Sequence, residues 1–172
     1  AKILNKLLDK YESNKKFVGQ NKVDNKIYIE IIKLFKAYLD ETNYDAFSAI
    51  NEAVELLITM KYVSATKKSN NTFNKVFLIE SDENLLQCYK ALNRTSKTDK
   101  NNKLINILNK YARLGNKILN TFCNKQLDNI TNNRCVKYFN DNYKLFEDIL
   151  SCVLHIQNVE NETYLREFSV KL

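Results

Sequence analysis

The sequence predicts a mainly α-helical protein with a small β component, in which a winged-helix-like first half is followed by an all-helical second half. Three observations predict this fold class. The 172 residues include two glycines and no proline, so few residues interrupt helices. Apolar residues recur at helical spacing along most of the chain. Two runs rich in β-branched and aromatic residues, 62–67 and 73–80, are joined by a short polar stretch that suits a hairpin.

The first half begins with an amphipathic helix over 2–13. Residues 27–39 remain ambiguous, because alternation at their start suits a short strand whereas the apolar spacing that follows suits a helix. A helix over 44–60, capped by Thr42 or Asn43, comes next, and the hairpin follows it. Helix, short strand, helix and hairpin in this order are typical of a winged helix.

The domain boundaries follow from changes in composition. The first domain is expected to span 1–92 and to end in a helix, and the polar, basic stretch 93–102 is expected to be a linker. A helical arm over 103–172 follows, with helices on both sides of Gly115 and a strong helix over 143–157. Apolar spacing persists to the last residue, which indicates a fragment cut from a longer protein.

No catalytic constellation is recognisable. Phosphate-binding glycine motifs, G-x-S-x-G and H-E-x-x-H do not occur. The single histidine, His155, and four cysteines form no zinc-ligand set of usual spacing, and the cysteines are expected to be buried or half-buried reduced thiols. No segment has the roughly 20 apolar residues of a membrane span. We therefore expect a cytoplasmic, non-enzymatic chain without catalytic residues, metal ligands or a cofactor.

Positive charge is concentrated in two stretches. Of the net charge of +7, residues 1–26 carry +4 and 90–144 carry +9, whereas 27–89 and 145–172 each carry −3. Clustered Lys and Arg release counterions from phosphate backbones, which favours a nucleic-acid partner. Codon bias toward Lys and Asn on a solvated surface is the competing interpretation. The helix over 44–60 carries three carboxylates and no cation, so base reading by this helix is not expected.

Three basic surfaces are candidates for contacts to the DNA backbone without sequence readout. They are the hairpin wing, the linker, and a face of the next helix on which lysines recur every seven residues. The candidate residues are Lys67, Lys68 and Lys75 in the wing, Arg94, Lys97 and Lys100 in the linker, and Lys103, Lys110 and Lys117 on the helix face.

Three stretches together resemble a known family. They are LLDKYESNKKF (7–17) running into GQNKV (19–23), NYD (43–45) ahead of INEAVELL (50–57), and YLREFSVKL (164–172). They resemble the N-terminal region of JetD, the nuclease subunit of the Wadjet plasmid-defence systems. In that family a winged-helix-like region and a helical arm precede a Toprim domain, and the whole resembles the A subunit of type IIB topoisomerases.

The resemblance implies a role in which DNA is engaged for a metal-dependent nuclease that works with SMC-type partner subunits. It implies a divalent metal only in the missing Toprim domain, and no catalytic residue carries over to this chain. We therefore expect the non-catalytic N-terminal part of a JetD-like nuclease. The alternative is a protein-interaction module, or a dimerisation module that forms a homodimer, that uses the acidic helix and the apolar faces of 143–157 and 164–172. A stand-alone winged-helix transcription regulator is the third hypothesis.

Overall fold

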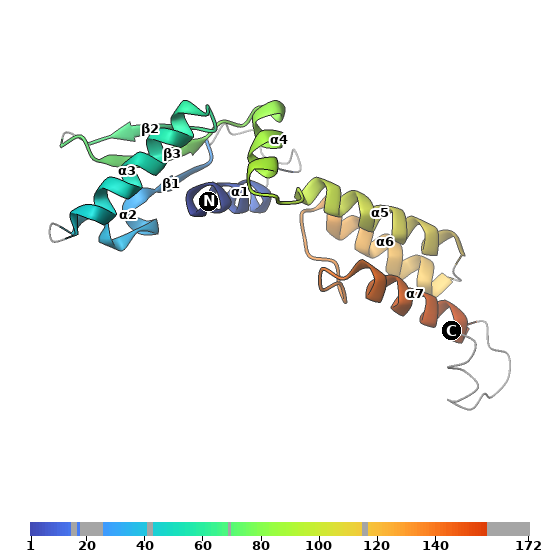
Figure 1. Ribbon diagram of the computed structural model, residues 1–172. Helices are drawn as coiled ribbons and strands as arrows, with labels where there is room; N and C mark the ends of the chain where they lie inside the picture. The colour runs from blue at the N-terminus through green and yellow to red at the C-terminus, as the bar shows by residue number, and fades with distance from the viewer. Residues whose placement is uncertain (15–16, 18–25, 41–42, 69, 115–116, 158–172) are drawn as a thin grey trace. The chain divides into compact units, whose positions relative to one another are not determined.

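The computed structural model describes residues 1–14, 17, 26–40, 43–68, 70–114 and 117–157 (Figure 1). The chain divides after Ser96 into two compact units. The described part is mainly helical with a small antiparallel sheet, which confirms the predicted fold class. The first unit contains α1 (Lys2–Ser13), β1 (Tyr28–Glu30), α2 (Ile31–Leu34), the 3-10 helix η2 (Lys36–Leu39), α3 (Tyr44–Thr59), β2 (Val63–Lys67), β3 (Phe73–Leu78) and α4 (Asp82–Ala91). The second contains α5 (Lys97–Leu114), α6 (Lys117–Thr131) and α7 (Tyr143–Gln157).

The sheet has the strand order β1-β3-β2, with antiparallel pairing throughout, so the hairpin strand β3 is central. The ambiguous region 27–39 therefore contains both a strand and two short helices. Ile29 pairs with Val76 across β1 and β3, and both side chains are buried. The β2–β3 pairing is irregular between Thr66 and Lys67. Because side chains alternate along a strand, the neighbours of Ile29 and Val76 lie on the opposite, outer face.

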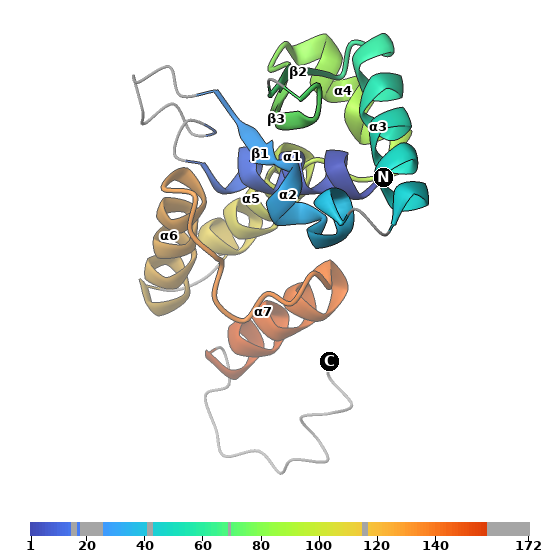
Figure 2. The ribbon, with the colours of Figure 1, turned by 90° about the vertical axis from the view of Figure 1, so that its left-hand side faces the viewer.

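Helix α1 supplies the apolar stripe that covers the sheet. It packs against β1 and β3, and it runs beside β1 in both views (Figures 1 and 2). Its buried residues Leu4, Leu7 and Leu8 recur at helical spacing and join Val54 of α3 in one core. The core of the first unit thus lies between the sheet and its helices.

Several helices end without glycine. Lys61, Asn93 and Asn133 follow α3, α4 and α6 with positive φ angles of 59°, 49° and 56°. Asn tolerates this left-handed conformation better than most residues, and it allows the next N–H groups to bond to the last helical carbonyls. Those bonds run from Tyr62 to Leu57, from Arg94 to Tyr89 and from Arg134 to Asn129. These three helices therefore satisfy carbonyl groups of their last turns without a glycine.

Tyr38 links three elements of the first unit. Its side chain is 1% exposed, and its hydroxyl donates to Asn51 Oδ1 of α3 at 2.7 Å. The same hydroxyl accepts the Phe73 N–H at the start of β3 at 2.8 Å. Burial, partly opposed by the Phe73 bond, raises the pKa of Tyr38 above its ordinary value, so the hydroxyl remains a donor. Residue 38 therefore holds η2, α3 and β3 together.

The second unit is built on a separate apolar core. Leu104 and Leu108 of α5, Leu119 and Cys123 of α6, and Phe146 of α7 are all buried there. Helix α5 packs against both α6 and α7. The prediction of a linker over 93–102 is wrong for its second half, because the chain is helical from Lys97 onward. Its polar residues are compatible with a solvated first turn, where Asp99 favours helix formation through the helix dipole.

All four cysteines are free thiols. Cys88 and Cys123 are buried and Cys152 is half-buried, as expected, but Cys135 is exposed in the irregular stretch before α7. Burial raises the pKa of the Cys88 thiol to about 11. Among the described helices, none combines the length and the apolar character that crossing a membrane requires.

Replacing Tyr38 with Phe is expected to lower the free energy of unfolding by about 1–3 kcal/mol, because it leaves the buried Phe73 N–H and the Asn51 amide without their partner. Urea denaturation of the full chain measures the effect. Tyr44→Phe is the matched control, because Tyr44 is 75% exposed, and it should change stability by less than about 0.5 kcal/mol. Equal effects from the two changes would contradict the linking role of Tyr38.

Alkylation of the native protein at pH 8 is expected to modify Cys135 first, Cys152 more slowly, and Cys88 and Cys123 only after denaturation. The thiolate is the reactive form of cysteine. With a pKa of about 11, only about one in a thousand Cys88 thiols is a thiolate at pH 8. Mass spectrometry of peptides over time distinguishes the four sites. Labelling of Cys88 as fast as that of Cys135 would show that the first core is open.

Candidate functional site

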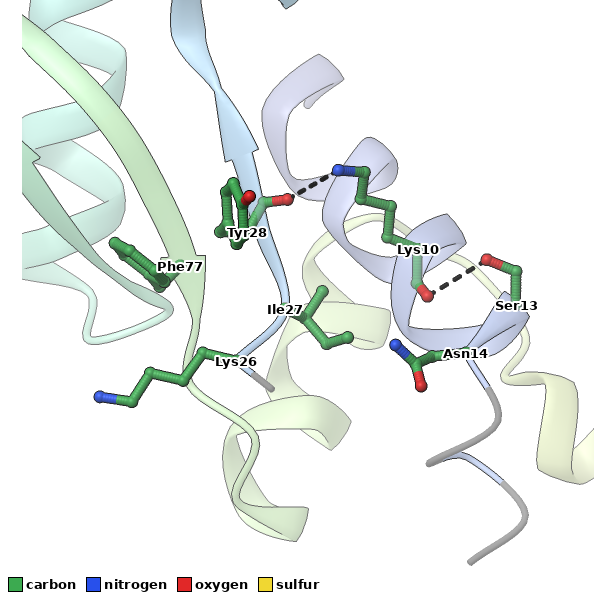
Figure 3. Close-up of a pocket in the computed structure, with 7 residues that line it drawn as sticks. All are labelled: Lys10, Ser13, Asn14, Lys26, Ile27, Tyr28 and Phe77. Carbon is green, nitrogen blue, oxygen red and sulfur yellow. Dashed lines mark hydrogen bonds between the residues drawn. The ribbon is translucent and has the colours of Figure 1, made fainter. Parts of the chain in front are cut away.

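A hollow of about 690 Å³ opens on the first unit where the end of α1 meets β1 and β3 (Figure 3). It combines basic, polar and aromatic side chains from segments far apart in the sequence. Its lining residues are Lys10, Ser13 and Asn14 at the end of α1, Lys26, Ile27 and Tyr28 at β1, and Phe77 on β3.

The strand register places the two aromatic rings side by side. Tyr28 lies directly opposite Phe77, and their ring centroids are 5.5 Å apart at an interplanar angle of 45°. Ile27 and Ile29, on either side of Tyr28, are both buried, so Tyr28 stays on the outer face of the sheet. Both rings are half-buried and thus offer part of their surface to a ligand.

Two lysines lie against the Tyr28 ring. Lys10 Nζ is 5.4 Å from its centroid and donates a hydrogen bond to the Tyr28 carbonyl oxygen at 2.9 Å. Lys75 Nζ is 4.5 Å from the same centroid, so both ammonium groups lie within cation–π range. An ammonium group has three donors, so Lys10 keeps donors for a bound anion after its bond to the carbonyl. Exposed Lys26 also lines the hollow and brings a second lysine to its described lining beside Lys10.

The negative charge of Glu30, at the end of β1, is paired with nearby lysines. Glu30 lies opposite Lys75 and accepts a hydrogen bond from Lys33 at 3.0 Å. This hydrogen bond lowers the pKa of Glu30, which therefore stays ionised and paired near neutral pH. Among the described residues that line the hollow there are two lysines, Lys10 and Lys26, and neither Asp nor Glu.

This arrangement suits a polyanion that carries planar groups. Ammonium groups bind phosphate oxygens, and aromatic side chains accept the faces of bases or the edges of sugars. Among the described residues, no group of three or more His, Cys, Asp or Glu is placed to hold a metal ion. The chemistry available in the hollow is binding by charge and stacking.

The structure separates the three lysines predicted for the wing. Lys75 Nζ lies against the Tyr28 ring at the edge of the hollow, whereas Lys67 lies 3.8 Å from Glu55 of α3 and 4.6 Å from the Phe73 ring centroid. Lys68 is exposed at the hairpin turn. The three lysines therefore have different surroundings, and their contact with the DNA backbone stays a prediction.

The structure corrects the prediction for Arg94. Its guanidinium lies 2.8 Å from Asp9 and 2.5 Å from Glu12, and Glu12 also accepts the Tyr89 hydroxyl at 2.8 Å. Partial burial lowers the pKa of Arg94, but hydrogen bonds and charges from Asp9 and Glu12 outweigh it and raise the pKa overall. Burial, reinforced by Glu12, raises the pKa of Tyr89 well above its ordinary value. Arg94 thus ties the end of α4 to α1 and is not a free phosphate contact.

The remaining candidates lie in the second unit, where several have partners. Lys97 donates to Asn133 at 2.5 Å, Lys100 lies 3.3 Å from Asp141, and Lys110 lies 2.6 Å from Glu147. The predicted common face of Lys103, Lys110 and Lys117 is wrong, because α5 ends at Leu114 and Lys117 begins α6. Lys103 Nζ lies 5.7 Å from the Tyr143 ring centroid, on the α7 side of α5.

These ion pairs do not remove the positive charge of the second unit. Exposed pairs contribute little free energy, so their lysines can exchange a carboxylate for a phosphate at low cost. Over residues 97–157, ten Lys and Arg face five Asp and Glu. The second unit therefore has a net positive charge that is spread over its surface, whereas the hollow is a defined concave site lined by two lysines and two aromatic rings.

The sequence reasoning missed Lys10, Lys26, Tyr28 and Phe77. The available signal was the alternation of Ile27, Tyr28 and Ile29, which places Tyr28 on the outer face once β1 is accepted as a strand.

Comparison of the chain with protein-family models, with curated proteins and with solved structures found no match in any of the three.

Replacing Arg94 with Gln is expected to lower the free energy of unfolding by about 1–3 kcal/mol, because Glu12 loses a charged partner in a half-buried position. Chemical denaturation measures the loss. Lys90→Gln is the control, since it removes the same charge from an exposed position of α4 and should change stability by less than about 0.5 kcal/mol. Unchanged stability of the Arg94 variant together with weaker DNA binding would restore Arg94 as a phosphate contact.

Proposed function

We propose that this chain binds the DNA backbone without sequence selectivity through the basic, aromatic hollow on its winged-helix unit. The observation that carries the proposal is the Tyr28–Phe77 ring pair, with the ammonium groups of Lys10 and Lys75 against Tyr28 and with Lys26 lining the same hollow. Phosphate contacts of this kind supply affinity without reading bases. Steering by the excess charge of the second unit would speed the encounter.

The charge of α3 supports this choice of surface. Asp45, Glu52 and Glu55 give this helix three negative charges and no positive one, so phosphate would repel it. A winged helix that reads bases inserts the equivalent helix into the major groove. The sheet side of the unit is therefore the better DNA-facing surface.

The wider role in this proposal rests on the resemblance to JetD. The chain would be the non-catalytic N-terminal part of a plasmid-defence nuclease, holding DNA for a Toprim domain that carries a divalent metal. SMC-type subunits would be the partners that deliver the DNA. The cations of the hollow suit this role, because a nuclease that acts on plasmids of any sequence needs contacts to the backbone.

A second candidate function is supported by the exposed surface of α3. A groove of about 280 Å³ lies between this helix and the start of α1, lined mainly by apolar side chains that include Phe35, Ala49, Ala53 and Leu56. Leu56 is 55% exposed. Because α3 also carries three carboxylates, this groove would suit an amphipathic helix of a partner protein that has Lys or Arg next to its apolar face. The chain would then be an interaction module.

Binding to a labelled mixed-sequence duplex is expected to weaken steeply between about 50 and 200 mM salt. Removing two phosphate contacts with Lys10→Gln and Lys26→Gln should reduce the magnitude of the logarithmic salt slope by about 2. Fluorescence anisotropy across a salt series measures this slope. A second duplex of unrelated sequence should give the same affinity.

Lys36→Gln is the matched control. It removes the same charge from an exposed lysine of η2, outside the hollow, and should leave the slope unchanged. Equal losses from all three changes would mean that only net charge matters and that the hollow is not the site. Absence of binding at low salt would contradict DNA binding and leave the α3 groove as the functional surface.

A further inference from the structure

The outer face of the sheet in the first unit presents aromatic and small polar side chains. The six residues that the strand register places on this face are Tyr28 and Glu30 of β1, Lys75 and Phe77 of β3, and Ser64 and Thr66 of β2. Their neighbours Ile29, Val63 and Val76 are buried in the core on the opposite face. Ser64 and Thr66 are exposed, and the other four side chains are half-buried. The outer face therefore keeps two aromatic rings within reach of a ligand.

These two rings form an aromatic platform, Tyr28 and Phe77, beside the hollow. The residues are paired across β1 and β3, and their ring centroids are 5.5 Å apart (Figure 3). Ser64 is the partner of Phe77 on β2, and its side chain is small and exposed. A flat group that stacks on Phe77 can therefore extend over β2 without meeting a bulky side chain at this position.

Lysines lie close to the aromatic platform. Lys10 and Lys75 lie against one of its rings, and Lys26 lines the hollow beside it. The carboxylate that the register places on the same face, Glu30, is paired with Lys33 at 3.0 Å. The charges around the platform thus favour an anionic occupant.

We propose that the aromatic platform binds unpaired bases, so that the preferred DNA of this chain is single-stranded or locally opened. This inference rests on the DNA-binding function proposed above and deepens it, because it names the form of DNA that the same hollow takes. Aromatic side chains that stack on bases, beside cations that follow the backbone, are a common means of holding single strands. Aromatic rings on an open sheet face bind unpaired bases of RNA in the same way.

The accessibility of base faces distinguishes the two forms of DNA. In a duplex, neighbouring base pairs cover the faces of each base, and bringing a base out of the stack costs free energy. In a single strand, a base can stack on Tyr28 or Phe77 without this cost. The hollow of about 690 Å³ lies within the size range of small-ligand sites, which suits single nucleotides.

Charge alone would produce the opposite preference. Each phosphate contact releases about 0.9 counterions from a duplex but about 0.7 from a single strand, because the duplex has the higher charge density. The lysines by themselves therefore favour duplex DNA. Tighter binding of a single strand would have to come from its bases, so the strand preference reports directly on the platform.

Fluorescence anisotropy of the full chain at one salt concentration tests the proposal with four labelled probes of equal length, about 12 nucleotides. They are a thymidine strand, an abasic strand with the same number of phosphates, a uridine RNA strand and a mixed-sequence duplex. We expect the thymidine strand to bind at least about 5-fold more tightly than the abasic strand and the duplex, because a stacked base contributes that much. The abasic strand keeps the charge and lacks the base faces, so this comparison needs no protein variant.

Substitutions then locate the effect on the protein. Tyr28→Leu and Phe77→Leu, which keep an apolar side chain at each position, should each weaken binding of the thymidine strand by about 5-fold or more. They should leave the affinities for the abasic strand and the duplex nearly unchanged. Tyr44→Leu is the matched control, because Tyr44 is 75% exposed on α3, outside the hollow, and it should change no affinity. Far-ultraviolet circular dichroism and urea denaturation check that each variant is folded.

Four outcomes would overturn the proposal. Equal affinities for the thymidine and abasic strands, or variant losses that are equal for all probes, would exclude base stacking on the platform. A duplex that binds as tightly as the thymidine strand or more tightly would exclude the strand preference and leave backbone binding in place. Tighter binding of the uridine strand would assign the platform to RNA. Absence of binding to every probe at low salt would contradict the proposed function itself, so the two failures are distinguishable.

Discussion

The candidate site depends on the register of β1 against β3. Ile29 and Val76 face each other in the core, and burial of such side chains contributes about 1.5–3 kcal/mol each. Because side chains alternate with a period of two, a slip by one residue would bury Tyr28 and expose Ile29. The outward position of the aromatic pair therefore follows from the burial of its apolar neighbours. Lys10 approaches the pair because α1 packs against the same strands.

Local signals predicted much of the fold. Asn43 and Ser81 each accept a backbone N–H at the start of a helix, as polar residues ahead of an apolar stripe indicate. The hairpin followed from two β-branched runs around a polar turn. The structure of residues 27–39 could not be predicted, because a three-residue strand and two four-residue helices are shorter than the stretches over which alternation or helical spacing can be recognised. That uncertainty concealed the outer face of β1 and with it the hollow.

The site was harder to predict than the fold, because a charge count does not show which charges meet. Arg94 is separated from Glu12 by 82 residues, and Lys110 is separated from Glu147 by 37, so neither pair is visible in a local pattern. Lys75 was predicted as part of the wing, and the structure places its ammonium group against the Tyr28 ring. The structure shows two kinds of contact for basic residues. Arg94 forms ion pairs with Asp9 and Glu12 of α1, whereas Lys10 and Lys75 lie against the Tyr28 ring.

The outer strands of the sheet bear on how the chain behaves at high concentration. β1 is three residues long, and Lys10 already occupies the Tyr28 carbonyl. β2 departs from regular pairing between Thr66 and Lys67, and Lys67 and exposed Lys68 follow at its end. Short, irregular and charged edges deny an incoming strand a template. Amyloid-like growth by strand addition is thereby disfavoured at both edges of the described sheet.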